Sequence, residues 1–174
     1  MKKPPPPRDP VEALGEAYEL LLEKSLDAAH KAEEKGGLAL HHFIDETKKD
    51  VAALNKLGKD EMDILAQYLK RDLNDAAQYL DKTGKELKDW FGFDIALIKD
   101  RLRDMFLLAA DQTTKELFEL KFRAQASEYH TGEITGPGTL LCDQCAEKLH
   151  FHKPGHIPPC PKCKGTRFHR EKIE

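Results

Sequence analysis

Every cysteine of the chain belongs to one of two Cys-x-x-Cys pairs. The pairs are Cys142 with Cys145 and Cys160 with Cys163, and fourteen residues separate them. In a Cys-x-x-Cys turn, two thiolates and the neighbouring backbone amides converge on one cation, and two such turns complete a tetrahedral set of four sulfurs. The spacing therefore predicts a four-cysteine site for one zinc ion, with iron as the less favoured metal.

The predicted metal is expected to fold its domain rather than to catalyse a reaction, because four thiolates leave no coordination position open for a substrate. The segment 129–174 is too short for an adequate hydrophobic core, whereas structural zinc contributes on the order of 10 to 16 kcal/mol at pH 7. Oxidation of zinc thiolates releases the metal, so a thiol redox sensor is an alternative function.

Three histidines, His150, His152 and His156, lie between the cysteine pairs and could compete as ligands. His150 and His152 would share one face of a strand, a geometry that is compatible with metal binding. Because four cysteines already satisfy the ion, we expect all three histidines on the surface. Phe151, on the opposite face of that strand, is expected to pack inward.

The composition describes a soluble, polar chain. Of its residues, 40% are hydrophobic and 34% are charged, and the mean hydropathy is −0.63. The charged fraction exceeds the globular average of roughly 25%, which favours long helices with solvated faces and an elongated molecule over a compact α/β enzyme. The net charge of −3 identifies no partner by itself.

No segment has the pattern of an export signal or a membrane span. The start, MKKPPPPRDP, has prolines where a secretory signal would need an apolar run. The longest apolar run, Phe106 to Ala110, is far shorter than the roughly twenty residues of a membrane helix. We therefore expect a cytoplasmic protein without membrane contact, where paired cysteines favour metal binding over disulfides.

Apolar residues at spacings of three and four predict a mainly α protein, with long amphipathic, coiled-coil-like and antiparallel helices over residues 11–128. The segment 1–10 is expected to be a disordered, Pro-rich tail. Heptad spacing from Met62 to Leu80 and from Phe91 to Ala109 predicts seams that need partners, in this chain or in another copy. Gly92 interrupts the last helix at a cost of about 1 kcal/mol, so we expect a break or kink near it.

The second helix is expected over residues 38–57. Its predicted apolar stripe consists of Leu40, Phe43, Ile44, Val51, Leu54 and Leu57.

Beyond Tyr129 the pattern changes to a glycine-rich segment and to the alternating segments KLHFH and TRFHR, which predict short strands and turns. A small β domain is therefore expected over 129–174.

This C-terminal part resembles the bacterial zinc ribbon-containing proteins, a family of unknown function. The resemblance is carried by the segment YHTGEITGPG from Tyr129, by the two cysteine pairs and by Phe168. It implies a zinc ribbon with the four cysteines as ligands, preceded by a charged helical region. One departure is that Ala146 and Lys164 follow the cysteine pairs, where many ribbons have glycine.

These observations favour a non-enzymatic interaction or regulatory adaptor that binds a protein partner, or a second copy of the chain, through its helices. The chain has only two serines, and it lacks a phosphate-binding glycine loop, a His-Glu-x-x-His motif and a nucleophile elbow. We therefore expect no catalytic residues, and the sequence identifies no small-molecule substrate.

Nucleic-acid binding through the last predicted strand is an alternative. Its candidate contacts are the cations Lys162, Lys164, Arg167 and Arg170, with Phe168 between the arginines as a residue that could stack on bases. Four thiolates with one Zn²⁺ carry a charge of about −2, which cancels much of this positive charge. The adaptor reading is therefore preferred.

Overall fold

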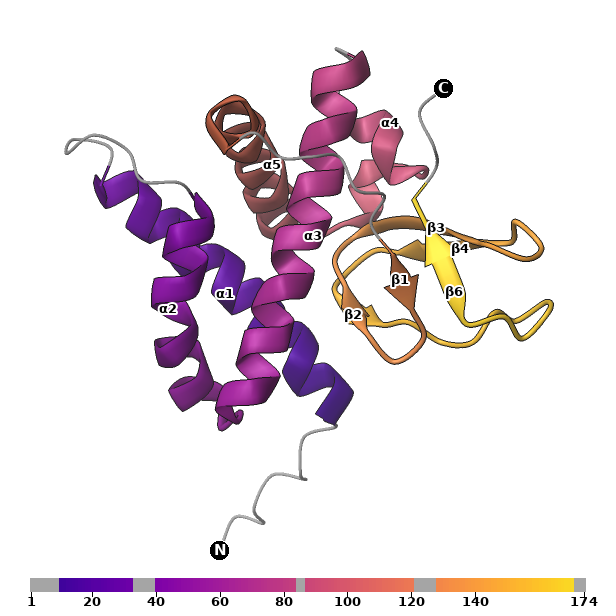
Figure 1. Ribbon diagram of the computed structural model, residues 1–174, viewed down its shortest axis with the longest axis horizontal. Coiled ribbons are helices and arrows are strands. Elements are labelled where there is room, and N and C mark those ends of the chain that lie inside the picture. Colours follow the sequence, from indigo (N-terminus) through magenta and orange to yellow (C-terminus); the bar gives the residue numbers. More distant parts are fainter. Residues whose placement is uncertain (1–9, 33–39, 84–86, 121–127, 171–174) are drawn as a thin grey trace, which may run out of the picture.

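The structure, a computed structural model, describes residues 10–32, 40–83, 87–120 and 128–170. The expected Pro-rich tail lies outside these residues except for Pro10. Helices come first and strands follow, as predicted (Figure 1). The helical elements are α1 (Pro10–Ala32), α2 (Leu40–Asn55), α3 (Lys59–Thr83), α4 (Lys88–Phe91), the 3-10 helix η2 (Ile95–Leu97) and α5 (Asp100–Leu120).

The long helices pack around one hydrophobic core. On α3, Leu65, Leu69 and Leu73 are fully buried, which confirms the apolar stripe predicted there. Figure 1 shows α2 beside α1 and α3, with α5 against α3, so the predicted seams contact helices of the same chain. No helix in the described part of the chain is long and apolar enough to cross a membrane.

The last predicted helix is interrupted more completely than by a kink. Gly92 ends α4 in the left-handed region at φ 75°, and the Asp94 carboxylate then accepts a hydrogen bond from the Ala96 N–H at 3.0 Å to begin η2. The break allows the rings of Trp90 and Phe91, which are consecutive residues at the end of α4, to reach the core formed by the helices.

The predicted apolar stripe of α2 contains one error, because the Leu54 side chain is 64% exposed.

The aromatic residues at this break form part of the core, as their type suggested. The Trp90 ring stacks on Phe106 of α5 with 5.7 Å between ring centroids, and Phe91 contacts the same ring at 5.7 Å. Of the predicted heptad positions, Phe91 before the break and Ile98, Leu102 and Ala109 after it are buried. A glycine is needed at the break because a Cβ on Gly92 would lie 2.7 Å from the Thr139 hydroxyl of the strand region.

The strand region is a small antiparallel fold. Four strands pair in the order β1-β6-β3-β4, and two form a separate pair, β2-β5. In the register of the larger sheet, Phe168 lies opposite both Tyr129 and Cys142, and Leu140 lies opposite Leu149, so a second small core forms on one face. The strands are β1 (Tyr129–His130), β2 (Ile134–Thr135), β3 (Gly138–Cys142), β4 (Lys148–Phe151), β5 (Gly155–His156) and β6 (Arg167–His169).

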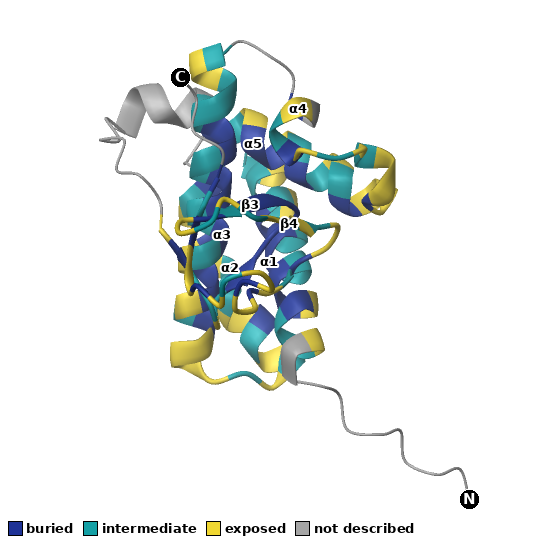
Figure 2. Ribbon diagram, turned by 90° about the vertical axis from the view of Figure 1, so that its right-hand side faces the viewer, coloured by how far each residue is buried: buried dark blue, intermediate teal, exposed yellow. Residues whose placement is uncertain are grey.

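The strand region packs directly on the helical body, the name given to residues 10–120 as far as they are described. Ile134 of β2 is buried in the core of the helices, and β2 contacts α3 while β5 contacts α1. Buried residues run through this contact in Figure 2. Gly136 permits the close approach, because a Cβ at that position would overlap the hydroxyl of Tyr18 on α1.

We expect the substitution Gly136→Ala to destabilise the protein by about 1 to 3 kcal/mol, because the added methyl group overpacks the contact with Tyr18. Gly155→Ala is the matched control, since a Cβ there meets its nearest atom at an ordinary 3.8 Å. Thermal unfolding of the two variants checks this. An equal melting temperature for both would contradict a close contact at Gly136.

Candidate metal centre

The structure brings the four predicted ligands together. Their sulfur atoms all lie within 4.8 Å of one another, with 3.5 Å between the Sγ atoms of Cys142 and Cys163 and 3.6 Å between those of Cys145 and Cys160. Zinc bonded to four sulfurs at about 2.3 Å requires sulfur separations of about 3.8 Å. The donor set therefore fits one tetrahedral metal ion, and it is the one such group of three or more in the described residues.

The two cysteine turns share one backbone conformation. The Ala146 N–H donates to the Cys142 carbonyl, and the Lys164 N–H donates to the Cys160 carbonyl, each at 2.9 Å. Ala146 and Lys164 have φ angles of 60° and 65°, in the left-handed region that favours glycine. The departure noted in the sequence thus leaves the turn geometry intact, at a local cost in backbone strain.

Backbone N–H groups and crowded sulfurs set the charge of the site. The pKa of Cys160 is lowered to about 7, first by the N–H of Cys163 and also by that of Lys162, against the effect of desolvation. The pKa of Cys163 is raised to about 12, since the Gly165 N–H lowers it but desolvation and the three other sulfurs together raise it more. The neighbouring sulfurs thus lower the pKa of Cys160 and raise that of Cys163, and a shared cation would stabilise both as thiolates.

The histidines between the cysteine pairs stay outside the donor set. His150, His152 and His156 are all exposed, as expected from the sequence. His150 Nδ1 lies 2.8 Å from the Thr139 hydroxyl, away from the sulfurs. Phe151 is half-buried and packs against the small core, which confirms its predicted inward orientation.

Comparison with known proteins agrees with this geometry. The chain matches the family described as zinc-ribbon containing domain over residues 27–172. It belongs to this family. The matched region begins inside α1 and continues through the strands, so the family comprises the helices as well as the strand region. Residues 128–170 are therefore called the zinc ribbon.

Related proteins are known from Escherichia coli. The uncharacterized protein YbeL of strain K12 is 29% identical over 137 residues, which cover 76% of this chain and 82% of YbeL. The YbeL proteins of strains O6:H1 (CFT073) and O157:H7 match to the same extent. No solved structure matches the chain significantly.

Asp72 of α3 is a fully buried carboxylate that joins the ribbon to the helices, and sequence reasoning missed it. It accepts hydrogen bonds from the Tyr18 hydroxyl at 2.6 Å and from the Gly136 N–H at 2.8 Å. Its Oδ1 lies 3.3 Å from Arg71 Nε and 3.6 Å from Arg170 Nη2. Burial raises the pKa of Tyr18, and Asp72 raises it further, so the phenol keeps the proton that it donates.

Arg170 is the ribbon's main contribution to this network. Its guanidinium lies 4.4 Å from the Trp90 ring centroid, and it donates to the Thr135 hydroxyl at 3.1 Å and to the Tyr129 hydroxyl at 3.3 Å. The residue is only 7% exposed, and Phe168 is 1% exposed. The prediction that Arg170 and Phe168 face a nucleic acid is therefore wrong, because both side chains point into the protein.

The Tyr-His-x-Gly-Glu segment completes the docking. Arg71 of α3 donates to Glu133 Oε1 at 2.7 Å and to the Ile134 carbonyl at 3.0 Å, and its guanidinium lies 4.0 Å from the Tyr129 ring centroid. The Tyr129 hydroxyl donates to Asp75. This segment is not needed to bind a metal, and the structure gives it a different task, which is to hold the ribbon on α3.

One signal in the sequence could have revealed the network. Asp72 lies next to Leu73 on the apolar stripe of α3 and one helical turn after Leu69, where an unpaired carboxylate would cost several kcal/mol. A charged residue in such a position requires a buried partner. The sequence could not name Arg170 as that partner, because the two residues are far apart in the chain.

We expect the substitution Lys164→Gly to stabilise the metal-loaded protein by up to about 1 kcal/mol. Glycine removes a left-handed strain of roughly 1 to 2 kcal/mol, and greater freedom of the unfolded chain offsets part of this gain. Lys162→Gly in the same turn is the matched control, since Lys162 is not among the residues with positive φ and should only lose stability. Denaturant titration measures both, and a loss of stability in both variants would contradict strain at Lys164.

Proposed function

We propose that the protein is a non-enzymatic adaptor that holds one structural zinc ion and binds a protein partner. The observation that carries the proposal is the closed donor set, in which four sulfurs within 4.8 Å of one another account for every tetrahedral position. Catalytic zinc sites have three protein ligands and keep the fourth position for water or substrate. The family's description as zinc-ribbon containing favours zinc over iron.

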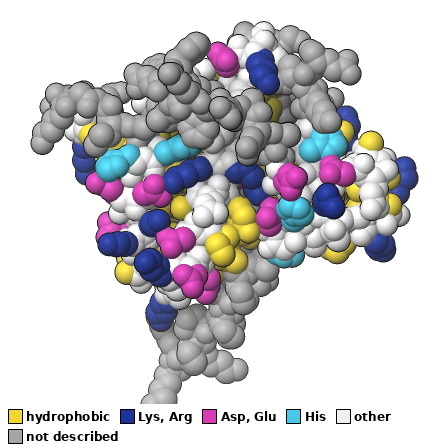
Figure 3. All heavy atoms as spheres, in the orientation of Figure 1, with side chains coloured by type: hydrophobic (Ala, Val, Ile, Leu, Met, Phe, Trp, Pro, Cys, Tyr) yellow, Lys and Arg dark blue, Asp and Glu magenta, His cyan; other side chains and the backbone are white. Residues whose placement is uncertain are grey.

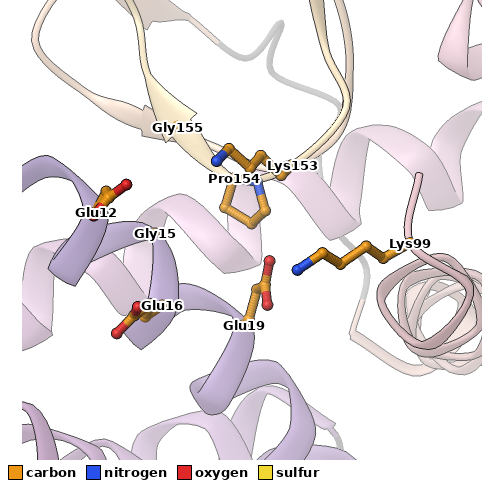
Figure 4. A pocket seen from close by; sticks show the side chains of 8 residues that line it. All are labelled: Glu12, Gly15, Glu16, Glu19, Lys99, Lys153, Pro154 and Gly155. Atoms are coloured by element: carbon orange, nitrogen blue, oxygen red, sulfur yellow. The ribbon is translucent and has the colours of Figure 1, made fainter. Parts of the chain in front are cut away.

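A charged cleft at the junction of helices and ribbon supports protein binding over small-molecule binding. It has a volume of about 360 Å³ and opens between α1, the start of α5 and the turn between β4 and β5 (Figure 4). Small-molecule pockets are lined predominantly by hydrophobic and aromatic side chains. Five of the eight residues that line this cleft are instead charged, namely Glu12, Glu16, Glu19, Lys99 and Lys153, and the other three are Gly15, Pro154 and Gly155.

The two walls of the cleft carry opposite charge. Glu12, Glu16 and Glu19 come from α1, whereas Lys99 and Lys153 come from the opposite segments, and Figure 4 shows Lys99 reaching toward Glu19. Burial raises the pKa of Glu19, and the two lysines lower it. A partner segment with both basic and acidic side chains would complement these walls, and such complementarity selects partners and speeds association.

Nucleic-acid binding is the second candidate, but burial of Arg170 and Phe168 leaves it fewer residues for contact with a nucleic acid. Lys162, Lys164 and Arg167 are exposed near the metal end of the ribbon, which favours contact with phosphates. The acidic residues Asp143 and Glu147 lie in the same end, and Lys162 Nζ is 4.0 Å from Glu147. Figure 3 shows charges of both signs interspersed over the described part of one face. These features favour the adaptor.

Cross-linked capture from cells of the source organism tests the adaptor. The test variant reverses charge on the α1 wall of the cleft with Glu12→Lys and Glu16→Lys. The matched control reverses two exposed carboxylates on α2 with Glu46→Lys and Asp50→Lys. We expect a defined protein to be captured by the wild type and the control, and its recovery to fall at least about tenfold with the cleft variant, because like charges disrupt a complementary contact.

Three outcomes would contradict the adaptor. The first is equal capture by all three proteins, and the second is the absence of any protein captured above a bait-free control. The third is capture that disappears after nuclease treatment and also after changing Lys162, Lys164 and Arg167 to Ala, which would support the nucleic-acid candidate instead. Elemental analysis of the purified bait, with one zinc expected per chain, tests the metal independently of any partner.

A further inference from the structure

The last strand of the ribbon connects the metal centre directly to the helical body. The Cys160–Cys163 turn leads into β6, which pairs with β1 on one side and with β3 on the other. Arg170 follows β6 immediately and reaches Asp72 on α3. The position of Arg170 thus depends on a strand whose beginning is fixed by two of the metal ligands.

The ribbon's own core is too small to hold this strand without the ion. It contains only six buried residues, and two of them, Cys142 and Cys160, belong to the donor set. Small metal domains of this kind lose their structure when the metal is removed. Loss of zinc therefore removes the support of β6 and of Arg170.

The helical body has a core of its own. Apart from Ile134, every buried residue of the larger cluster comes from the helical part of the chain, between Ala17 and Ala110. The helices also contact one another extensively, α1 with α2 and α3 with α5. Detachment of the ribbon would expose Asp72 to water, which solvates the carboxylate instead of leaving it buried without a partner.

We propose that the contact of Arg170 with Asp72 and Trp90 is a zinc-controlled latch, which holds the ribbon on α3 when zinc is bound and releases it when zinc is lost. The latch goes beyond the adaptor role, because it concerns two parts of the same chain and needs no partner. It rests on zinc as the bound ion. By linkage, the latch must also strengthen zinc binding by the same factor by which zinc strengthens docking.

Trp90 reports directly on the latch. It is the one tryptophan of the sequence, and the Arg170 guanidinium lies 4.4 Å from its ring centroid. On its other face the indole stacks on Phe106 of the helical core, and this contact should persist when the ribbon detaches. When the ribbon detaches, the indole gains contact with water, so its emission shifts to longer wavelength.

The experiment follows full-length zinc-loaded protein during titration with a chelator. Released zinc, Trp90 emission and far-UV circular dichroism are recorded together. We expect the emission shift to follow zinc release at every chelator concentration, while the helical circular dichroism signal is retained. Addition of zinc should restore the original emission.

Two variants on the same segment sharpen the test. Arg170→Met removes the guanidinium that reaches α3, whereas Arg167→Met removes an exposed one. Arg170→Met should weaken zinc binding about 5- to 150-fold and should show the shifted emission even when loaded with zinc. Arg167→Met should bind zinc within about twofold of wild type, since Arg167 is exposed and has no hydrogen bond or ion pair with the helices among the described residues.

Several results would overturn the latch. Unchanged Trp90 emission after complete zinc release would show that docking does not depend on zinc. Loss of the helical signal together with zinc would show one folding unit rather than a latch. Equal zinc affinities of Arg170→Met and Arg167→Met would contradict the linkage between zinc binding and docking of the ribbon. None of these results concerns the adaptor, whose partner experiment succeeds or fails separately.

Discussion

The structure depends on one buried carboxylate, Asp72, and on the groups that donate hydrogen bonds or present positive charge to it inside the protein. A carboxylate removed from water carries a penalty of several kcal/mol, which is repaid only when hydrogen bonds and opposite charges satisfy it completely. Here a phenol from α1, a backbone N–H from the ribbon, and two guanidinium groups share that task. Because the Gly136 N–H and the Arg170 guanidinium belong to the ribbon, all of these groups meet at Asp72 only when helices and ribbon are docked.

The metal ion folds the ribbon, and the polar network around Asp72 then holds the folded ribbon on the helices. Four thiolates around one ion fold a domain whose own core is too small, and the folded ribbon then places Tyr129, Glu133 and Arg170 where α3 can bind them. The glycines at the contact allow this approach, since a Cβ on Gly92 or Gly136 would collide with the facing side chain. The contact also creates the charged cleft, whose walls come from both parts of the molecule. A partner in this cleft would thus bind only the docked form.

Short-range patterns explain what could be predicted. Two Cys-x-x-Cys pairs identify a donor set because their spacing encodes its geometry, and apolar spacing identifies the face of α3 that carries Leu65 and Leu69. Long-range partners leave no such pattern. Arg170 looks like any basic residue on a strand, and only the fold shows that α3 covers it. The break after α4 was expected near Gly92, but its extent depends on how Trp90 and Phe91 pack against α5.

A double-mutant cycle between Asp72 and Arg170 tests the central claim most directly. The free energy of unfolding of zinc-loaded wild type, Asp72→Asn, Arg170→Met and the double variant would be measured by denaturant titration. Contacting residues in one buried network couple by about 0.5 to 3 kcal/mol, and this account predicts a value in the upper half of that range. Effects of the two substitutions that add to within about 0.5 kcal/mol would contradict it, because they would show that the two side chains stabilise the protein independently.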